Sequence, residues 1–321
     1  MAKRGALKSW QVLAILGALT LLAVLAYMTF NARGPWDFVL QLRGRKLWGM
    51  ALVAYAVAVS TVLFQTATGN RILTPSIMGF DALYQLVQTS FIMAFGGLAY
   101  LTLDPNLRFV LNAAVMVVMA TLLFRWLFGA QSRSLHLLVL VGIVFGVLFR
   151  SVSSLMARVI NPNDFAVLQD ALFANFSAIQ PTLLVVSTVI MAVASLGLIP
   201  IFHRLDVLLL GREPAIGLGV DHQRTISIVL AVIAVLVSVS TALVGPVLFF
   251  GLLVANLAYL VMPTHRHALV LPAAVLLALI GLVGGQAILE HGFGYDTALS
   301  IIIEFLGGLT FLYLLLRGAR R

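Results

Sequence analysis

The chain consists of long apolar stretches separated by short polar connections, a pattern that predicts helices crossing a membrane. A helix needs about 20 apolar residues to cross the roughly 30 Å of hydrocarbon in a bilayer. The stretches of about this length are Trp10–Phe30, Leu47–Thr68, Ala82–Leu103, Phe109–Phe128, Leu135–Met156, Gln180–Phe202, His267–Leu289 and Thr297–Leu316.

One further stretch, Thr225–Thr264, carries no formal charge and is about twice as long as one span requires. Gly245–Pro246 lies in its middle, where proline removes a backbone donor and favours a break. We therefore expect two spans here and about ten in the whole chain. No repeat or linker divides the sequence. The expected architecture is an all-α, polytopic integral membrane protein with one domain over residues 1–321.

Composition agrees with this architecture. Hydrophobic residues make up 62% of the chain and charged residues only 10%, whereas a soluble domain carries about 25% charged residues. An even number of spans places both termini on one side, and most Lys and Arg flank the spans on that side. Because cytoplasmic connections accumulate Lys and Arg, both termini are predicted to be cytoplasmic. Topology thus accounts for the net charge of +9, and no nucleic-acid partner is expected.

Sequence patterns for catalysis are missing. The chain contains no G-x-x-x-x-G-K-[ST] loop, no H-E-x-x-H, no G-x-S-x-G and no cysteine. His265 and His267 flank Arg266 in a short segment, which we interpret as a solvated polar loop rather than a metal site. A membrane enzyme is therefore disfavoured, and we expect no catalytic residue, metal or cofactor on this chain.

Ionisable residues inside spans are candidates for function. Asp81 lies near a span end, and we interpret it as a cap for a helix starting at Ala82. Glu304 lies deep enough to need a partner or water, so a hydrogen bond within the bundle or at a subunit contact is favoured over proton transport. Arg150 either extends its charge toward the interface or faces a polar pathway. Arg150 and Glu304 are the pathway candidates.

The polar segment 203–224 is unusually rich in charge for this chain. Two short apolar stretches, Val207–Leu210 and Ala215–Val220, are hinged at Gly211 and Pro214. This pattern predicts two short helices with a sharp bend, too short to be stable alone. It is consistent either with a helix that seats in a groove of another protein or with an ordinary structured loop.

Four segments, in order along the chain, resemble the motifs of one family. Asn70–Gly79 resembles N-P-L-A-x-P-x-x-L-G, and Leu210–Val220 resembles L-G-x-x-x-A-x-x-L-G-V. Gly245–Val254, with the later His265-Arg266 and Pro272, resembles G-x-x-x-F-x-G-L-x-V … H-R … P. Gly307–Leu315 resembles G-G-x-x-F-x-x-L-L. The chain therefore resembles the FecCD/BtuC-type permeases, the membrane subunits of type II ABC importers for ferric siderophores, haem and cobalamin.

Two departures stand out. Arg71 occupies the place of the family's proline, and Val254–Tyr259 replaces its V-P-H-x-x-R. The sequence of the Asn70 segment is similar to that found in a sub-branch of the family that handles catecholate-type iron siderophores. Permeases of this sub-branch commonly work as one of two non-identical membrane subunits.

The resemblance implies roles for three groups of residues. Coupling to an ATPase falls to the segment containing Gly211, Arg212, Glu213, Pro214, Ala215, Leu218 and Gly219. A cytoplasmic gate is formed by Asn70, Ile72 and Pro75 and by a second loop with Gln131, Ser132 and Ser134. Docking of a substrate-binding protein on the outer face falls to Arg43, Arg45 and Lys46.

The implied function is that of an inner-membrane permease subunit that moves a ferric siderophore, of the catecholate type, into the cytoplasm. Its implied partners are ABC ATPase subunits holding ATP and magnesium, a second permease subunit in a homodimer or a paralogous heterodimer, and a periplasmic or lipid-anchored binding protein. The alternatives are a haem or cobalamin importer of the same family and an ion-coupled secondary transporter. A secondary transporter would work without a second gene product and would carry more buried carboxylates than Asp81 and Glu304.

Overall fold

The computed structural model describes residues 8–30, 35–128, 135–176, 179–292 and 299–318, and all regular structure in these ranges is helical. The helices are α1 (Ser9–Thr29), α2 (Trp36–Thr68), α3 (Phe80–Phe95), α4 (Gly97–Thr102), α5 (Pro105–Phe128), α6 (Leu135–Ala157), α7 (Pro162–Ala171), α8 (Pro181–Leu196), α9 (Phe202–Leu208), α10 (Arg212–Gly217), α11 (His222–Val244), α12 (Phe250–Val261), α13 (His267–Gly292) and α14 (Leu299–Gly318).

Within the described ranges, 7 helical segments are long and apolar enough to cross a membrane. They are α1, α2, α5, α6, α11, α13 and the segment Pro181–Leu208, which joins α8 to α9. The remaining predicted spans correspond to α3, α12 and α14. The all-α polytopic fold with about ten spans is thus confirmed.

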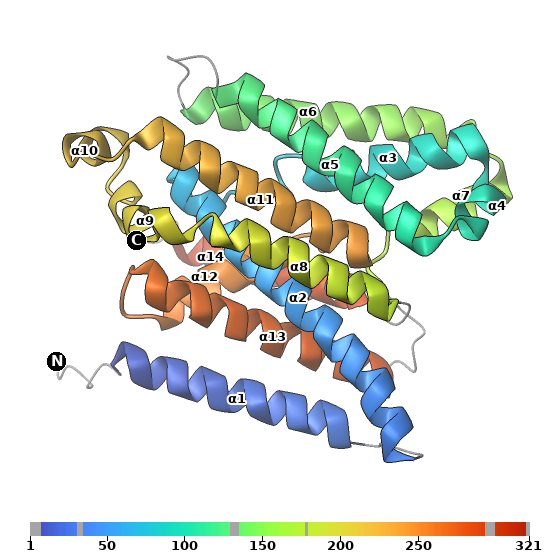
Figure 1. Cartoon of the computed structure of the whole chain (residues 1–321), viewed down its shortest axis with the longest axis horizontal. Coiled ribbons are helices and arrows are strands. Elements are labelled where there is room, and N and C mark those ends of the chain that lie inside the picture. The colour runs from blue at the N-terminus through green and yellow to red at the C-terminus, as the bar shows by residue number, and fades with distance from the viewer. Residues whose placement is uncertain (1–7, 31–34, 129–134, 177–178, 293–298, 319–321) are drawn as a thin grey trace.

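Three helices form the centre of the bundle. In Figure 1, α2 runs diagonally between α11 and α13, while α1 lies outside α13, and α5, α6 and α3 lie beyond α11. The apolar part of α2 is 72% buried and that of α11 is 67% buried, against 22% for α1 and 17% for α6. The peripheral helices therefore expose their apolar side chains, as expected for surfaces that face lipid or another subunit.

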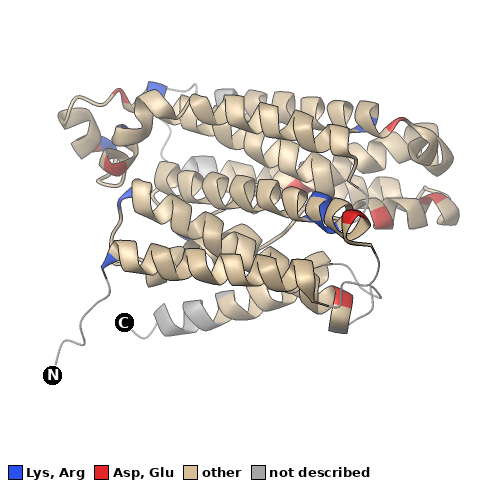
Figure 2. Cartoon of the chain, turned by 60° about the horizontal axis from the view of Figure 1, so that its bottom comes forward, with Lys and Arg blue, Asp and Glu red and all other residues tan. Residues whose placement is uncertain are grey.

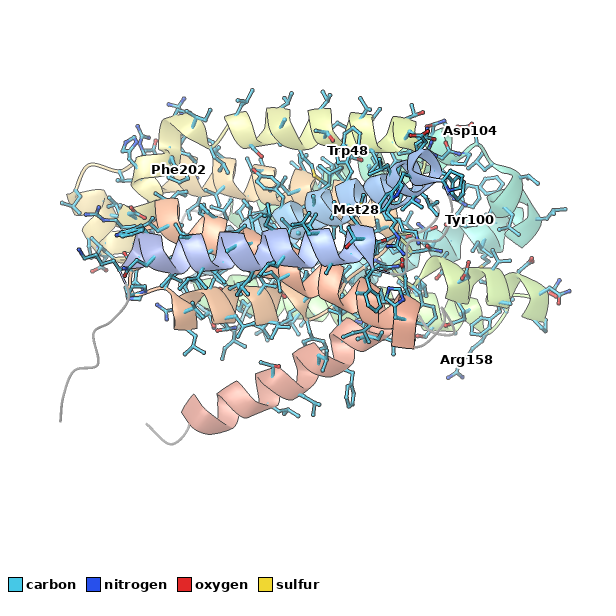
Figure 3. All side chains as sticks on the ribbon, turned by 90° about the horizontal axis from the view of Figure 1, so that it is seen from below. Met28, Trp48, Tyr100, Asp104, Arg158 and Phe202 are labelled. Atoms are coloured by element: carbon cyan, nitrogen blue, oxygen red, sulfur yellow. The ribbon has the colours of Figure 1, made fainter. Side chains whose placement is uncertain are left out.

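The bundle has two distinct ends. The short helices α9 and α10 lie at the end where α1 begins, which we call the insert end (Figure 1). Figure 3 shows Phe202 at this end and Tyr100, Asp104 and Arg158 at the other. Charged residues gather at these two ends and leave the middle largely uncharged (Figure 2). The helix directions agree with termini on one side, so the insert end corresponds to the predicted cytoplasmic face.

Two predicted boundaries were wrong. α2 begins at Trp36 rather than Leu47 and spans 33 residues, about 50 Å of helix, so Arg43, Arg45 and Lys46 are helical rather than in a loop. The predicted span Ala82–Leu103 is broken at Gly96, whose φ of 83° lies in the left-handed region, and it continues as α4.

Two non-helical segments interrupt the bundle next to central helices. One is the segment 69–79 between α2 and α3, and the other is 245–249 between α11 and α12, against which the non-helical residues Ala174 and Asn175 also pack. The predicted break at Gly245 is confirmed, with φ 99° at Gly245 and φ 53° at Phe249. α12 spans only 12 residues, about 18 Å. Because lipid cannot hydrogen-bond an exposed backbone, such breaks are tolerated only inside the protein or around a cavity.

The close approach of α3 and α6 depends on glycine. A Cβ on Gly79 would lie 2.8 Å from Cα of Gly146, and φ at Gly79 is 103°. We expect Gly79→Ala to lower the free energy of unfolding by about 2–5 kcal/mol, because left-handed backbone strain adds to overpacking. Thermal unfolding of the detergent-solubilised protein measures this.

The matched control for this variant is Gly17→Ala on α1. A Cβ there meets nothing within 4 Å, so its unfolding temperature is expected to stay at the wild-type value or rise slightly. Equal unfolding temperatures for the two variants would show that α3 and α6 can move apart to accommodate the extra methyl group without loss of stability.

Candidate translocation path and coupling surface

The predicted gate loop leads from the insert end into the interior. Asn70 Oδ1 accepts a hydrogen bond from the backbone N–H of Ile72 at 2.9 Å, and Gln65 Nε2 donates to the Arg71 carbonyl at 2.7 Å. Asn70 and Ile72 are exposed, whereas Pro75 is buried. The loop is therefore ordered by its own side chains and by α2, and it ends in the membrane interior.

Both departures from the family pattern meet at this loop. The Arg71 guanidinium lies over the ring of Tyr259 on α12, with 4.7 Å between Cζ and the ring centroid. Asn256, also on α12, donates to the Arg71 carbonyl at 3.5 Å. Arg71 and Tyr259 line an open cavity of about 570 Å³ together with Asp206 and Arg266. A cation–π contact thus ties the gate loop to α12 and keeps a positive charge at the insert end.

A second, much smaller cavity lies deeper, where the two helix breaks meet. It is lined by Ser60 and Thr61 of α2, Thr74, Pro75 and Ser76 of the gate loop, Asp81 of α3, Ser240 and Thr241 of α11, and Gly245 and Phe249 of the second break, among others. Polar side chains therefore follow the buried end of the gate loop.

The capping interpretation of Asp81 was wrong. α3 begins at Phe80, its N-cap is Gly79, and no side chain caps it. Asp81 lies in the first turn with 9% of its surface exposed, and its Oδ2 has no hydrogen-bond partner. The proximity of the α3 N-terminus favours the carboxylate but does not satisfy its oxygen.

The two pathway candidates lie around Asp81. Arg150 on α6 and Glu304 on α14 both interact electrostatically with its carboxylate. Arg150 is exposed on the apolar face of α6, and Glu304 is half-buried. The sequence placed these residues in separate spans, and the fold brings three charged side chains from three helices to one region.

The segment 203–224 forms two short helices, α9 and α10, with a bend at Gly211, where φ is 95°. Ala215 is fully buried, whereas Gly211, Arg212, Glu213, Pro214, Leu218 and Gly219 are exposed. Ile216 and Leu218 expose 52% and 65% of their surfaces. The two-helix prediction is confirmed, and the outer side of α10 presents apolar side chains to the cytoplasmic side.

A chain of hydrogen bonds from the exposed Asp206 to the buried His267 and Thr66 anchors this insert. Asp206 Oδ1 lies 2.6 Å from His267 Nδ1 and accepts a bond from the His267 backbone N–H at 2.8 Å. His267 Nε2 lies 2.8 Å from Thr66 Oγ1. The interpretation of His267 as part of a solvated loop was wrong, because it begins α13 and is 2% exposed. The chain connects α9, α13 and the end of α2, so the insert is fixed to the helix that carries the gate loop.

The three predicted docking residues differ in their surroundings. Lys46 is buried and pairs with Glu290 of α13 at 3.2 Å. Arg43 donates to the carbonyls of Tyr27 and Phe30 at 2.6 and 2.9 Å, which joins α2 to the end of α1. Arg45 is exposed. Of the three, Arg45 is the side chain most available to a partner, and the docking role stays a prediction.

The second predicted gate loop, with Gln131, Ser132 and Ser134, lies outside the described residues. The sequence did not indicate the residues that join distant helices: His267 and Asp206 at the insert end, and Tyr27 and Glu290, which are 3.1 Å apart. The His265-Arg266 match was the only signal near His267, and no local pattern pairs Glu290 with residues so distant in the sequence.

Comparison with known proteins gives a consistent result. A family model described as the FecCD transport family matches residues 8–317. The petrobactin import system permease protein YclO of Bacillus subtilis (strain 168) is 41% identical over 305 residues, which cover 95% of this chain and 96% of that protein. The petrobactin import system permease protein FatC of Bacillus anthracis is 33% identical over 321 residues, which cover 98% and 91%.

A solved structure shares the fold. The structure of a metal-chelate type ABC transporter in an inward-facing conformation superposes with a TM-score of 0.83 at 20% sequence identity, covering 96% of this chain and 99% of that one. The overall fold of this chain is therefore one that occurs in a solved structure.

Proposed function

Because the chain belongs to the FecCD transport family, we propose that it is the permease subunit of an ABC importer for a ferric siderophore of the petrobactin kind. It is a multi-pass protein of the inner (plasma) membrane. The proposed substrate rests on the 41% sequence identity to a petrobactin permease over nearly the whole of both chains.

The geometry supports a transport role. A polar gate loop descends from the insert end into the bundle and ends beside buried hydroxyls and Asp81. Helix breaks at membrane depth are expected around a path for a hydrophilic solute. The described residues contain no group of three or more His, Cys, Asp or Glu side chains that could hold a metal ion.

The partners form the second part of the proposal. ATP and magnesium bind to a separate ATPase pair, which receives α10 with Ile216 and Leu218. A substrate-binding protein docks at the opposite end near Arg45. A second permease copy or a paralogue covers exposed apolar faces of α6 and α14, where Leu148, Leu155, Phe305 and Leu309 are exposed. Type II importers pass their substrate between two such subunits, consistent with Arg150 and Glu304 on these helices.

Uptake of iron-55 petrobactin by cells with and without this chain tests the proposed substrate. We expect at least a tenfold loss of uptake on deletion and full recovery when the wild-type chain is supplied again. Haem and cobalamin uptake, measured in the same cells, should be unchanged. Unchanged petrobactin uptake, with loss of haem or cobalamin uptake instead, would assign the chain to the alternative branch of the family.

A further inference from the structure

The cavity beside Asp81 has the size of a single small guest. Its volume is about 20 Å³, and roughly 10–15 Å³ suffices to hold one water-sized particle. The cavity is bounded by α2, α11, the first turn of α3 and both helix breaks. A guest there would contact both the segment 69–79 and the segment 245–249.

The lining is mixed: hydroxyl side chains and the Asp81 carboxylate share it with apolar residues such as Val53, Val57 and Val237. Oδ2 of Asp81 is buried without a hydrogen-bond partner. Thr61 and Thr241 face the cavity with side chains only 2% and 5% exposed. The Ser60 and Ser240 hydroxyls donate to the carbonyls of Val57 and Val237, which leaves their oxygen lone pairs available. The carboxylate interacts with the Ser76 side chain and, electrostatically, with Arg150, but a buried oxygen left without a hydrogen-bond partner still costs free energy, which a cation or a proton at Oδ2 would recover.

The local charge favours a monovalent cation. Asp81 interacts electrostatically with the basic Arg150 and the acidic Glu304, and the formal charges of the three residues sum to one negative charge. The C-terminal end of α11, with Ser240, Thr241 and Gly245, also borders the cavity. Helix C-termini carry partial negative charge and stabilise cations. One monovalent cation would therefore neutralise the region.

We propose that this cavity is a sodium site. Carboxylate, hydroxyl and carbonyl oxygens are ligands for hard cations, and neither nitrogen nor sulfur donors for a transition metal line the cavity. Asp81 supplies the charge, and Thr61, Ser76 and Thr241 supply neutral oxygens. Broken helices of membrane transporters bind sodium through such unwound backbone and helix C-termini.

The bound ion would add a link between three parts of the protein at the depth of the cavity. Thr61 belongs to the central helix α2, Ser76 to the gate loop and Thr241 to the helix before the second break. Sodium is therefore expected to stabilise the arrangement in which the gate loop lies against α11, without being transported in stoichiometric amounts.

Binding of sodium-22 to the assembled importer in lipid nanodiscs tests this directly. We expect one saturable sodium ion per copy of this chain. At sodium concentrations 100-fold above the dissociation constant, with N-methylglucamine chloride keeping ionic strength constant, the unfolding temperature should rise by about 5 °C. Potassium chloride should give little or no rise. No saturable sodium binding, or equal stabilisation by all three salts, would overturn the proposal and leave water or a proton as the partner of Asp81.

Three variants assign the binding to this cavity. Asp81→Asn is expected to abolish sodium-22 binding, and Thr241→Val, which keeps the charge, to weaken it about tenfold. Thr89→Val is the matched control, because Thr89 is a buried hydroxyl on α3 that bonds the Gln85 carbonyl outside the cavity. If Asp81→Asn does not fold, Thr241→Val still decides the matter. Unchanged affinity in Thr241→Val, or retained binding in Asp81→Asn, would place the ion elsewhere and refute the site.

Discussion

Replacing Ile216 with aspartate is expected to stop ATP-driven uptake while leaving the permease folded. Ile216 lies on α10 with 52% of its surface exposed, so the new charge is solvated in the isolated subunit. In the proposed complex the same side chain enters an apolar groove of the ATPase, where an unpaired carboxylate costs several kcal/mol. A loss of about 3 kcal/mol corresponds to a dissociation constant weakened more than 100-fold. Co-purification of the ATPase and siderophore uptake measure the effect.

The conservative variant Ile216→Val is the control for this experiment and should keep both ATPase binding and uptake. The thermal unfolding of both variants, measured on the permease alone, should match the wild type because the position is exposed. Stoichiometric ATPase retained by Ile216→Asp, with normal uptake, would show that α10 is an ordinary loop element and that coupling occurs elsewhere.

Much of the fold follows from local sequence, because each membrane-spanning segment must be long and apolar enough to cross the bilayer by itself. The long apolar runs, the break at Gly245 and the bend at Gly211 depend only on length, proline and glycine, and all three predictions were confirmed. The start of α2 was missed for a different reason. Lys46 reads as the end of a polar loop, and only the fold supplies Glu290, 244 positions away, to neutralise it.

In the candidate site, too, local sequence predicts the segments but not the contacts between them. The two short helices of the insert and the non-helical segment 69–79 agree with the sequence motifs that mark them, while the gating role of that segment stays a prediction. The chemistry around them depends on distant partners. Asp206 and His267 are 61 residues apart, and Asp81 becomes unusual only because its carboxylate is buried beside hydroxyls from α2 and α11. A pattern of single residues cannot show which side chain remains without a partner after the helices have packed.

Replacing Lys46 with methionine is expected to destabilise the outer end of the bundle by about 3–5 kcal/mol, because it removes the ammonium group that lies 3.2 Å from the buried Glu290 carboxylate. The side chains of Lys46 and Glu290 are 8% and 5% exposed. Glu290 Oε1 also accepts bonds from Tyr27 and Gln286, at 3.1 and 3.0 Å, so α1 and α13 lose the centre of a shared network. Thermal unfolding of the purified permease measures the loss.

Two further variants separate the buried charge from the loss of a side chain. The double variant Lys46→Met/Glu290→Gln removes both charges and keeps an acceptor for Tyr27, so it should recover at least half of the lost stability. Arg45→Met, at the adjacent exposed position, should change the free energy of unfolding by less than about 0.5 kcal/mol. If Lys46→Met were as mild as Arg45→Met, the ion pair would not contribute to joining α2 to α13. If the double variant were no better than Lys46→Met, the defect would come from packing of the lysine stem rather than from the lost ammonium group.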